Sequence, residues 1–523
     1  MSTTPSGFTP PGASQTHEIY GTVWHDAGSG QQPPAGPTAP AGPPAKKHRA
    51  LRWLAPALGL VLVAGGGAYG ATKVLASPQP DEVIPSNAIT YVRVDVDPSL
   101  GQKVAAVRFL HQVPDVKDVL SGSDFRKEVF LKAKQQNPEL RDVDYDRDVK
   151  PWLGDRLGIA LLPPAYGAKE PSLLVALQVK DEQKARAGLQ KLLSGDDQPD
   201  VAFRDGYALL IDKGQKSWLN SYLADGSLAD NAQYVADMKA LGNQGVVSGW
   251  ADLRKINRLS DQSTPAAVED AVNGLGRTAF ALRFDPGYLE LAGVVRGMKS
   301  VSNTTTDLPS HLADLPANTA VALQVSRPDQ AVAGLWKQLN KTGLGVQKDF
   351  RQQVADIERG FGVTLPRDLQ TVVGKRLVLA APAQQLSPDG MPTLGLRVQT
   401  DATRANGILS RVDRQLRQAG MQVPIHHTAK GGELVVATSG RYLDQLSRPG
   451  TLGQNPAFRK AVADPAHAAA ALFVDLDKVE GQYLPQIQDK DARAFAKTLS
   501  AVGFSASVQD DGDVSFQARL VGD

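Results

Sequence analysis

The chain of 523 residues contains no cysteine, and aromatic residues make up only 6% of it. Without cysteine there is no disulfide scaffold, thiolate zinc site, iron–sulfur cluster or cysteine nucleophile. The two signs of charge nearly balance, with 57 lysines and arginines against 55 aspartates and glutamates. The net charge of +2 gives no electrostatic reason to expect a nucleic-acid partner. A chain of this length predicts about three folded units, or two large ones and an unfolded segment.

Residues 1–45 are rich in proline and glycine and show no periodic apolar pattern. Such a segment cannot bury enough apolar surface to offset the entropy lost on ordering. We therefore expect a disordered cytoplasmic tail. Ile19, Tyr20 and Trp24 could form a short docking motif in it, although incidental aromatic residues are the simpler interpretation.

A basic cluster at residues 46–52 precedes Trp53–Thr72, twenty consecutive residues without a charge. Twenty helical residues span about 30 Å, the thickness of the hydrocarbon layer of a membrane. Residues 46–76 are thus predicted to form a basic flank and a single transmembrane helix in the plasma membrane. The basic flank predicts a cytoplasmic N-terminus and an extracytoplasmic C-terminal part. A signal peptide cleaved near Ala76 is the alternative.

Glycines are frequent inside this predicted helix. Gly65–Gly70 matches the pattern G-x-G-x-x-G, but a dinucleotide site needs a strand before these glycines and a helix after them. Gly66 and Gly70 are instead spaced as a small-xxx-small pair, which allows two helices to approach closely. Two interpretations follow: the helix associates with another copy through these two glycines, or the span is merely rich in glycine.

Beyond the predicted helix, one long sequence pattern occurs twice with an offset of about 220 residues. We predict two homologous modules, residues 81–302 and 308–523, joined by a polar linker at 302–309. Each module is long enough for a core of its own. The corresponding segments include Ile84–Val96 with Leu315–Val325, Trp152–Leu157 with Val372–Leu377, and Gly249–Leu253 with Leu472–Leu476.

Each module combines apolar strand patterns with amphipathic helices, so the predicted fold class is α+β. Strand pairs joined by two to four residues cannot be parallel. We therefore expect a mostly antiparallel sheet in each module, with helices on one face. The clearest strand patterns are Ile89–Val96, Leu157–Leu162, Leu173–Val179 and Ala208–Ile211. The clearest hairpins are Phe280–Val295 and Phe504–Ala518, and the clearest helices are Glu182–Leu193 and Thr403–Gln418.

Acidic residues that recur in both modules have a structural explanation. Asp181 and Asp401 directly precede predicted helices, and Asp252 and Asp475 end apolar strands just before a helix. An aspartate at such a position accepts hydrogen bonds from free backbone N–H groups. We predict that all four are helix caps.

The remaining acidic and histidine patterns do not form a site. Asp142, Asp144, Asp146 and Asp148 alternate like the start of a calcium loop, but the required glycine and glutamate are absent. A solvated acidic loop is the simpler interpretation. Asp95 and Asp97 form a D-x-D pattern without a nucleotide-binding domain around it. The adjacent His426 and His427 would point to opposite sides of a strand, and Ser439 lacks the glycine that begins a nucleophile elbow. We assign no catalytic, cofactor-binding or metal-ligating residue, and no cofactor.

The tail, the single basic-flanked helix, the segment 84–99 (IPSNAITYVRVDVDPS), the block Trp152–Arg156 and the V-K-D sequence at 179–181 together resemble a known family. It is the bacterial domain-of-unknown-function family 3352 (DUF3352) of high-GC Gram-positive bacteria, and the resemblance extends over residues 45–523. The resemblance implies a cell-envelope setting and supplies no catalytic residues.

Two classes of function follow. The favoured one is a non-catalytic, bitopic envelope protein whose modules bind a lipid, a wall component or a protein partner. An apolar groove between sheet and helices would suit such a role. The alternative is an envelope hydrolase or transferase, which a deep pocket with converging polar side chains would favour.

Overall fold

The computed structural model describes residues 78–523, with gaps at 97, 111–124, 137–139, 169, 194–197, 260–275, 298–309, 342–347, 387–389, 422–423 and 510–511. The predicted tail, the transmembrane helix with Gly66 and Gly70, and the linker at 302–309 lie outside the described residues. None of the helices in the described ranges combines the length and apolar character needed to cross a membrane.

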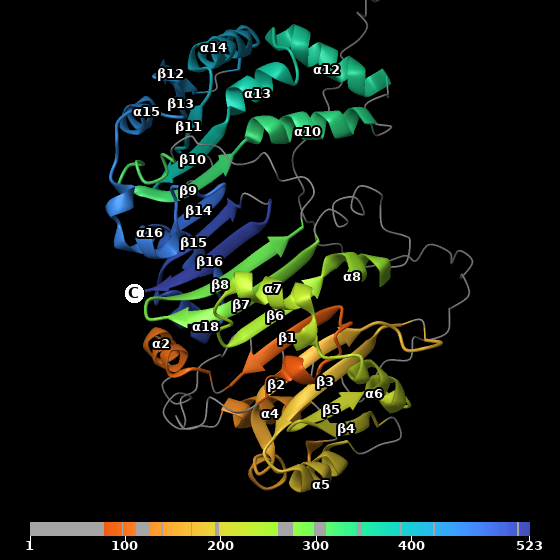
Figure 1. The fold of residues 1–523 in the computed structure, drawn as a ribbon. Helices are drawn as coiled ribbons and strands as arrows, with labels where there is room; N and C mark the ends of the chain where they lie inside the picture. Colours follow the sequence, from red (N-terminus) through yellow and green to blue (C-terminus); the bar gives the residue numbers. More distant parts are fainter. Residues whose placement is uncertain are drawn as a thin grey trace, which may run out of the picture. The chain divides into compact units, whose positions relative to one another are not determined.

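One antiparallel sheet of 16 strands runs through the described part of the chain (Figure 1). The first half of the chain contributes β1 (Thr90–Asp95), β2 (Leu153–Leu162), β3 (Ser172–Val179), β4 (Asp200–Arg204), β5 (Tyr207–Ile211), β6 (Val247–Asp252), β7 (Arg277–Asp285) and β8 (Tyr288–Arg296). The second half contributes β9 (Thr319–Ser326), β10 (Arg376–Pro382), β11 (Gly395–Gln399), β12 (His426–Lys430), β13 (Glu433–Ala437), β14 (Ala470–Asp475), β15 (Leu499–Val508) and β16 (Val514–Gly522).

The two halves of the sheet have the same strand order. From the edge to the middle, the first half is β4-β5-β3-β2-β1-β6-β7-β8 and the second is β12-β13-β11-β10-β9-β14-β15-β16. Each strand of the first half thus has a counterpart at the same place in the second, which is the arrangement expected of a duplicated unit. We refer to residues 78–297 as module 1 and to residues 310–523 as module 2.

The two modules meet where β8 pairs with β16. Tyr288 lies opposite Val521, and Val295 lies opposite Val514. Because β8 and β16 are counterparts, this antiparallel pairing has approximate two-fold symmetry, like the isologous interface of a homodimer. The expectation of a separate sheet in each module is therefore wrong. The prediction failed because a hairpin pattern identifies only the strand partner on one side. In two separate sheets, the other sides of β8 and β16 would be unpaired edges.

Helices surround the sheet in both modules. Module 1 contains α2 (Leu100–Leu110), α4 (Phe125–Gln136), α5 (Glu182–Leu192), α6 (Lys216–Ala224), α7 (Ala232–Leu241) and α8 (Leu253–Leu259). Module 2 contains α10 (Pro328–Lys341), α12 (Lys348–Phe361), α13 (Arg367–Val373), α14 (Ala402–Gln418), α15 (Gly440–Leu446), α16 (Pro456–Ala461), α17 (Leu476–Tyr483) and α18 (Lys490–Ala496). Short helical turns add η1 (Pro80–Val83), η3 (Tyr145–Val149), η4 (Leu228–Asp230), η5 (Leu452–Gln454) and η6 (Leu484–Gln486).

Strands in module 1 are covered by helices on both faces, so the expectation of helices on one face is wrong. All five residues of β5 are buried. Leu209 belongs to a core cluster with Leu219 of α6, whereas its neighbour Leu210 belongs to a second cluster with Leu189 of α5. The continuous apolar run of β5 is typical of a strand buried on both faces, since a strand with one solvated face alternates.

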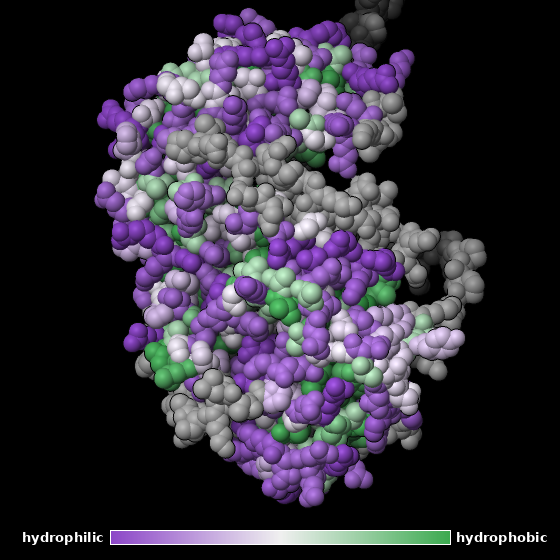
Figure 2. All heavy atoms as spheres, in the orientation of Figure 1, coloured by the Kyte–Doolittle hydropathy of each residue, from purple (hydrophilic) through white to green (hydrophobic). Residues whose placement is uncertain are grey.

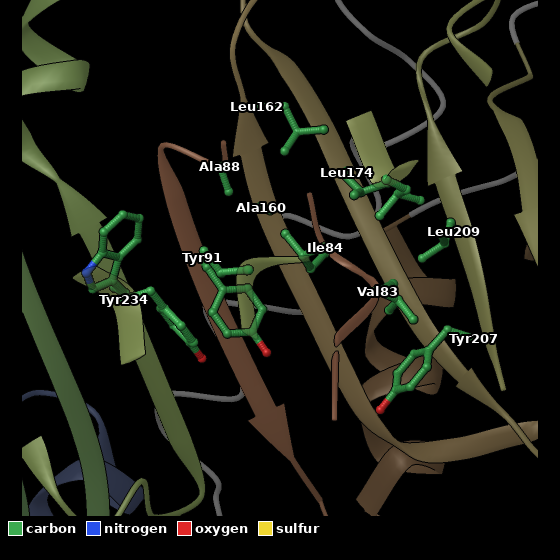
Figure 3. Close-up of a cluster of buried hydrophobic side chains, with 14 of the residues drawn as sticks. Val83, Ile84, Ala88, Tyr91, Ala160, Leu162, Leu174, Tyr207, Leu209 and Tyr234 are labelled. Atoms are coloured by element: carbon green, nitrogen blue, oxygen red, sulfur yellow. The ribbon is translucent and has the colours of Figure 1, made fainter. Parts of the chain in front are cut away.

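The first described residues of module 1 are part of its core (Figure 3). Val83 and Ile84 have no exposed surface and pack in one cluster with Tyr91, Tyr207 and Tyr234. The hydroxyl of Tyr207 donates to the carbonyl oxygen of Pro78 at 2.8 Å, and that of Tyr234 donates to Asp81 at 3.0 Å. Burial raises the pKa of the Asp81 carboxyl. The segment that follows the predicted membrane helix is thus integrated into module 1.

Candidate functional site

A cleft of about 900 Å³ lies in module 2. It is found at the strand ends where β10 begins, β11 ends, and β12 turns into β13. The N-terminal ends of α10 and α14, and the helix α13, border it; α13 packs against both α10 and α14. Side chains over this group of helices are mostly hydrophilic (Figure 2). The cleft is lined by His311, Asp329, Arg367, Gln370, Thr371, Gly374, Lys375, Gln399, Thr400, Asp401, Arg404, Lys430, Gly431, Gly432 and Glu433.

Backbone geometry keeps the rim of the cleft open. Gly431 and Gly432 form the turn between β12 and β13 with φ angles of 60° and 81°, a region that favours glycine. A Cβ atom at Gly374 would lie 2.4 Å from the carbonyl oxygen of Gln399, so the two strands can approach only because this residue is glycine.

The basic side chains of the cleft are only partly neutralised. Arg404 donates to Asp368 at 2.9 Å. Arg367, Lys375 and Lys430 are exposed, and among the described residues no carboxylate lies within ion-pair distance of them.

The acidic side chains of the cleft are all engaged. Asp329 lies 3.0 Å from Arg327, and Glu433 accepts two hydrogen bonds from Arg397 at 2.9 and 2.8 Å. Neither arginine lines the cleft. Asp401 accepts the backbone N–H of Arg404 at 3.1 Å. The cleft therefore presents a surplus of positive charge to an entering molecule.

Arg376, the first residue of β10, lies directly behind this lining. It is only 3% exposed, and its cross-strand neighbours are Ser326 on β9 and Gln399 on β11. Within the described residues, Nε and Nη1 of Arg376 and Oγ of Ser326 have no hydrogen-bond partner. Burial lowers the pKa of the Arg376 guanidinium. A buried cation without a partner is costly, so its retention needs an explanation.

Module 1 shows how the same arginine is satisfied. Arg156 on β2 is the counterpart of Arg376, and it lies opposite Asp95 on β1. Nε of Arg156 is 3.5 Å from the Asp95 carboxylate, which also accepts from Arg93 at 2.6 Å. In module 2, Ser326 stands where module 1 has Asp95. The arginine is thus present in both modules, but its carboxylate partner is present in only one.

Residues 54–217 match the family described as "Protein of unknown function (DUF3352)". This DUF3352 match includes Asp95 and Arg156 of module 1 but none of the cleft in module 2. The resemblance inferred from the sequence for residues 45–523 is therefore shown for 54–217. No curated protein matches the chain.

Two solved structures share limited similarity with the chain. They are described as "Structure of crystal form I of TP0453" and "Structure of crystal form IV of TP0453", with 12% and 9% sequence identity and TM-scores of 0.22 and 0.23. Each covers 45% of this chain, and the similarity extends over 83% and 87% of the TP0453 chains.

The four predicted helix caps are confirmed. Asp181 accepts the backbone N–H of Lys184, and Asp401 that of Arg404, each at 3.1 Å. Asp252 accepts from Arg254 and Lys255, and Asp475 accepts from Lys478. These carboxylates therefore hold helix ends in both modules.

The acidic run in module 1 is dispersed into separate contacts. Asp144 caps η3 by accepting from the backbone of Arg147, and Asp146 pairs with Lys127 and Lys150. Asp148 is buried, so the interpretation of the whole run as a solvated loop is wrong.

Asp148 is instead a structural ion-pair centre that recurs in module 2. It accepts from Arg147 and from Lys191 of α5, which hold its pKa well below the usual range, and from the backbone of Asp144. Its counterpart Asp368 is also buried and accepts from the backbone of Thr364 and from Arg404 of α14. Each carboxylate fixes a turn to the helix that follows β3 or β11.

The remaining sequence candidates lie apart from one another. Asp95 is bound by arginines, as described above, and Asp97 lies outside the described residues. Nδ1 of His427 is 2.7 Å from Oδ1 of Asn406, and burial lowers the pKa of this ring. Ser439 precedes α15 without a side-chain cap bond. No three histidine or acidic side chains of the described ranges converge as a metal site would require.

Sequence reasoning missed the cleft and Arg376. The available signal was the exchange of Asp95 for Ser326 beside an arginine that both modules keep. Recognising it required knowing that β1 lies next to β2 and β9 next to β10, because Asp95 and Arg156 are distant in sequence.

Proposed function

We propose that this is a non-catalytic cell-envelope protein, anchored in the plasma membrane by Trp53–Thr72, whose module 2 cleft binds an anionic lipid or wall component. The surplus of cations in the cleft carries this proposal. Arg367, Lys375 and Lys430 converge on one cavity of about 900 Å³, a size that accommodates a small organic ligand. The predicted apolar groove has no role in it, because the residues that line the cleft are polar or charged side chains and glycines.

The hydrogen bonds of the hydroxyl and carboxyl groups in the cleft favour binding over catalysis. The hydroxyl of Thr371 donates to the carbonyl oxygen of Arg367, and that of Thr400 donates to the carbonyl oxygen of Thr371. The proton of each hydroxyl is therefore directed at a carbonyl oxygen, and among the described residues neither hydroxyl is hydrogen-bonded to a base that would activate it as a nucleophile. The acids Asp329 and Glu433 are held by arginines.

A hydrolase or transferase acting in the same cleft is the second candidate. Nδ1 of His311 lies 3.1 Å from Oδ2 of Asp314, and His311 lines the cleft. A histidine oriented by a carboxylate can act as a general base. In this candidate His311 would activate a water molecule or a ligand hydroxyl.

The decisive experiment is recovery of the full chain from membranes in mild detergent, followed by native mass spectrometry of bound lipids and wall fragments. We expect the wild type to retain an anionic ligand, and the double variant K375E/K430E to lose it. K490E is the matched control, because Lys490 is an exposed lysine of α18 that is not part of the cleft. Equal retention by K375E/K430E and wild type would refute the cleft as the binding site.

The same preparation separates binding from catalysis. If the cleft only binds, His311→Gln leaves the chemical identity of the bound ligand unchanged. If the wild type carries a cleaved or transferred product and H311Q carries the intact precursor, the enzyme candidate is correct.

The proposed topology is tested on intact cells stripped of their wall. Added protease should degrade the chain beyond residue 80 and spare the N-terminal tail. Protection of module 2 in this experiment would overturn the proposed orientation.

A further inference from the structure

We propose that the cleft recognises a phosphate group, which Arg376 and Ser326 hold where β9 ends and β10 begins. The inference rests on the proposed function, since it identifies the chemistry of the ligand in the same cleft. Its basis is the pair of buried groups without hydrogen-bond partners, a guanidinium and a hydroxyl on adjacent strands.

The two modules provide an internal comparison for this pair. In module 1 the arginine at this place faces a carboxylate that the chain itself supplies, Asp95. In module 2 the arginine is buried more deeply than Arg156, and the facing residue is a serine. An oxyanion from a ligand would occupy the position of the missing carboxylate, accepting from the guanidinium and from the serine hydroxyl.

Arg376 lies next to residues that line the cleft. Gly374 and Lys375 immediately precede it in the chain, and Gln399 lies opposite it on β11; all three line the cleft. Because Arg376 is the first residue of β10, it lies at the strand ends where the cleft opens. Arg376 therefore adjoins the lining of the cleft both along the chain and across the sheet.

The number of cations favours a phosphate over a carboxylate. In module 1, two arginines, Arg156 and Arg93, surround the singly charged carboxylate of Asp95. Here Arg367, Lys375 and Lys430 surround the approach in addition to Arg376, while the acids of the cleft are engaged. A phosphate ester or diester in this field gains from several cations at once.

The test measures thermal unfolding of the full chain in a phosphate-free maltoside detergent. The probes are inorganic phosphate, and short-chain phosphatidylglycerol with short-chain diacylglycerol as its phosphate-free control. We expect a phosphate probe to raise the Tm of the wild type, because a ligand that binds only the folded state stabilises it. A response to inorganic phosphate alone identifies free phosphate as sufficient, and a response confined to phosphatidylglycerol identifies a lipid headgroup.

Two variants examine the site without depending on one fold-sensitive substitution. Arg376→Met removes a buried unpaired charge, so it should keep or raise the Tm without ligand, and weaken phosphate binding by about 10- to 100-fold, the range for losing a charge-assisted hydrogen bond. Ser326→Asp recreates the pair of module 1. It should raise the Tm without ligand and abolish the phosphate response.

Asp95→Asn in module 1 is the matched control. It should lower the Tm while leaving the phosphate response in place. An unchanged phosphate response in both R376M and S326D, or no response of the wild type to any phosphate probe, would overturn this inference. If K375E/K430E still loses its native ligand in that case, the proposed function stands and only the phosphate assignment fails.

Discussion

Asp237 of module 1 has no exposed surface, and three donors converge on its carboxylate. Nε1 of Trp250 donates to it at 2.9 Å, and Nε and Nη2 of Arg277 donate at 2.6 and 3.1 Å. Module 2 fills the same places with two alanines and a phenylalanine, all buried. A buried ion pair and an apolar set are thus alternative solutions for one position in the fold. The counterparts in module 2 are Ala461, Ala501 and Phe473.

We predict that Asp237→Ala lowers the free energy of unfolding by about 3–5 kcal/mol, because it leaves the partly buried Arg277 guanidinium without its partner. The double variant D237A/R277A, which copies module 2, should recover most of this loss. Denaturant unfolding followed by circular dichroism provides the comparison. A double variant no more stable than D237A would show that the pair does more than neutralise itself.

Asp148→Asn should lower the free energy of unfolding at pH 7 by about 1–2 kcal/mol, because an amide cannot replace a carboxylate that accepts from two cations. Arg147 and Lys191 keep the pKa of Asp148 low in the folded state. Its contribution is therefore fully present above the unfolded pKa of about 3.9 and is lost as the pH falls toward the folded value.

The control for this prediction is Asp142→Asn, since Asp142 is an exposed residue of the same run. Thermal melts across the pH range should show D142N close to wild type throughout. The difference between wild type and D148N should shrink below about pH 4. A constant difference down to pH 2 would contradict a role for the charge of Asp148.

At the scale of single elements, local patterns predicted most of the secondary structure. The predicted strand Leu173–Val179 is β3, the predicted helix Thr403–Gln418 is α14, and both predicted hairpins are present as β7–β8 and β15–β16. Alternation, capping aspartates and turn glycines are local signals. They predict the elements correctly because the core buries the same apolar faces that the local pattern indicates.

Other features depend on contacts between distant segments, and no local pattern indicates them. The apolar run of β5 indicates burial on both faces, but only the positions of α5 and α6 show which helix covers which face. The burial of Arg376 depends on β9 and β11 as neighbours. Composition and periodicity report on faces of elements, whereas register and strand order determine which side chains meet.

Gly293 on β8 supports the ring of Phe516 on β16, which lies directly opposite it. A Cβ atom at Gly293 would lie 2.2 Å from Cζ of this ring. Gly293→Ala should therefore lower the free energy of unfolding by about 1–3 kcal/mol, the usual cost of overpacking. Denaturant titration of the full chain measures this change.

Gly334→Ala is the matched control for Gly293→Ala. Gly334 lies inside α10, and a Cβ atom there would meet nothing within 4 Å. The substitution should stabilise the protein by up to about 1 kcal/mol, because alanine favours a helix. If both substitutions had the same effect, the contact with Phe516 would not be the cause.

At the scale of the whole described part, the modules share more than a strand pairing. Phe284 and Val247 of module 1 lie in one core cluster with Leu499 of module 2. Across the junction, Arg519 donates to the buried Glu290 at 2.8 Å. We therefore expect the two modules to unfold together.

The absence of cysteine makes the junction directly testable. Leu291 and Ala518 lie opposite each other on β8 and β16, and Leu291 is 39% exposed. Opposite residues of an antiparallel pair are about 4.5–5.5 Å apart, which suits a disulfide. Under mild oxidation, L291C/A518C should form an intramolecular crosslink that shifts mobility on a non-reducing gel.

The control pairs Leu291→Cys with Phe516→Cys, two residues away along β16. This diagonal separation of about 7–8 Å is too long for an unstrained disulfide. Efficient crosslinking of L291C/F516C, with none of L291C/A518C, would show that the register differs from that described.

The near-symmetric pairing of β8 and β16 also bears on how the two modules could diverge. In a homodimer, one gene encodes both subunits, so every substitution appears twice. Joining two copies in a single chain removes that restriction, because each position can then mutate alone. One copy can keep Asp95 as a permanent internal counter-ion while the other carries Ser326. In this way a symmetric ancestor with two equal sites can become a molecule with a single specialised site.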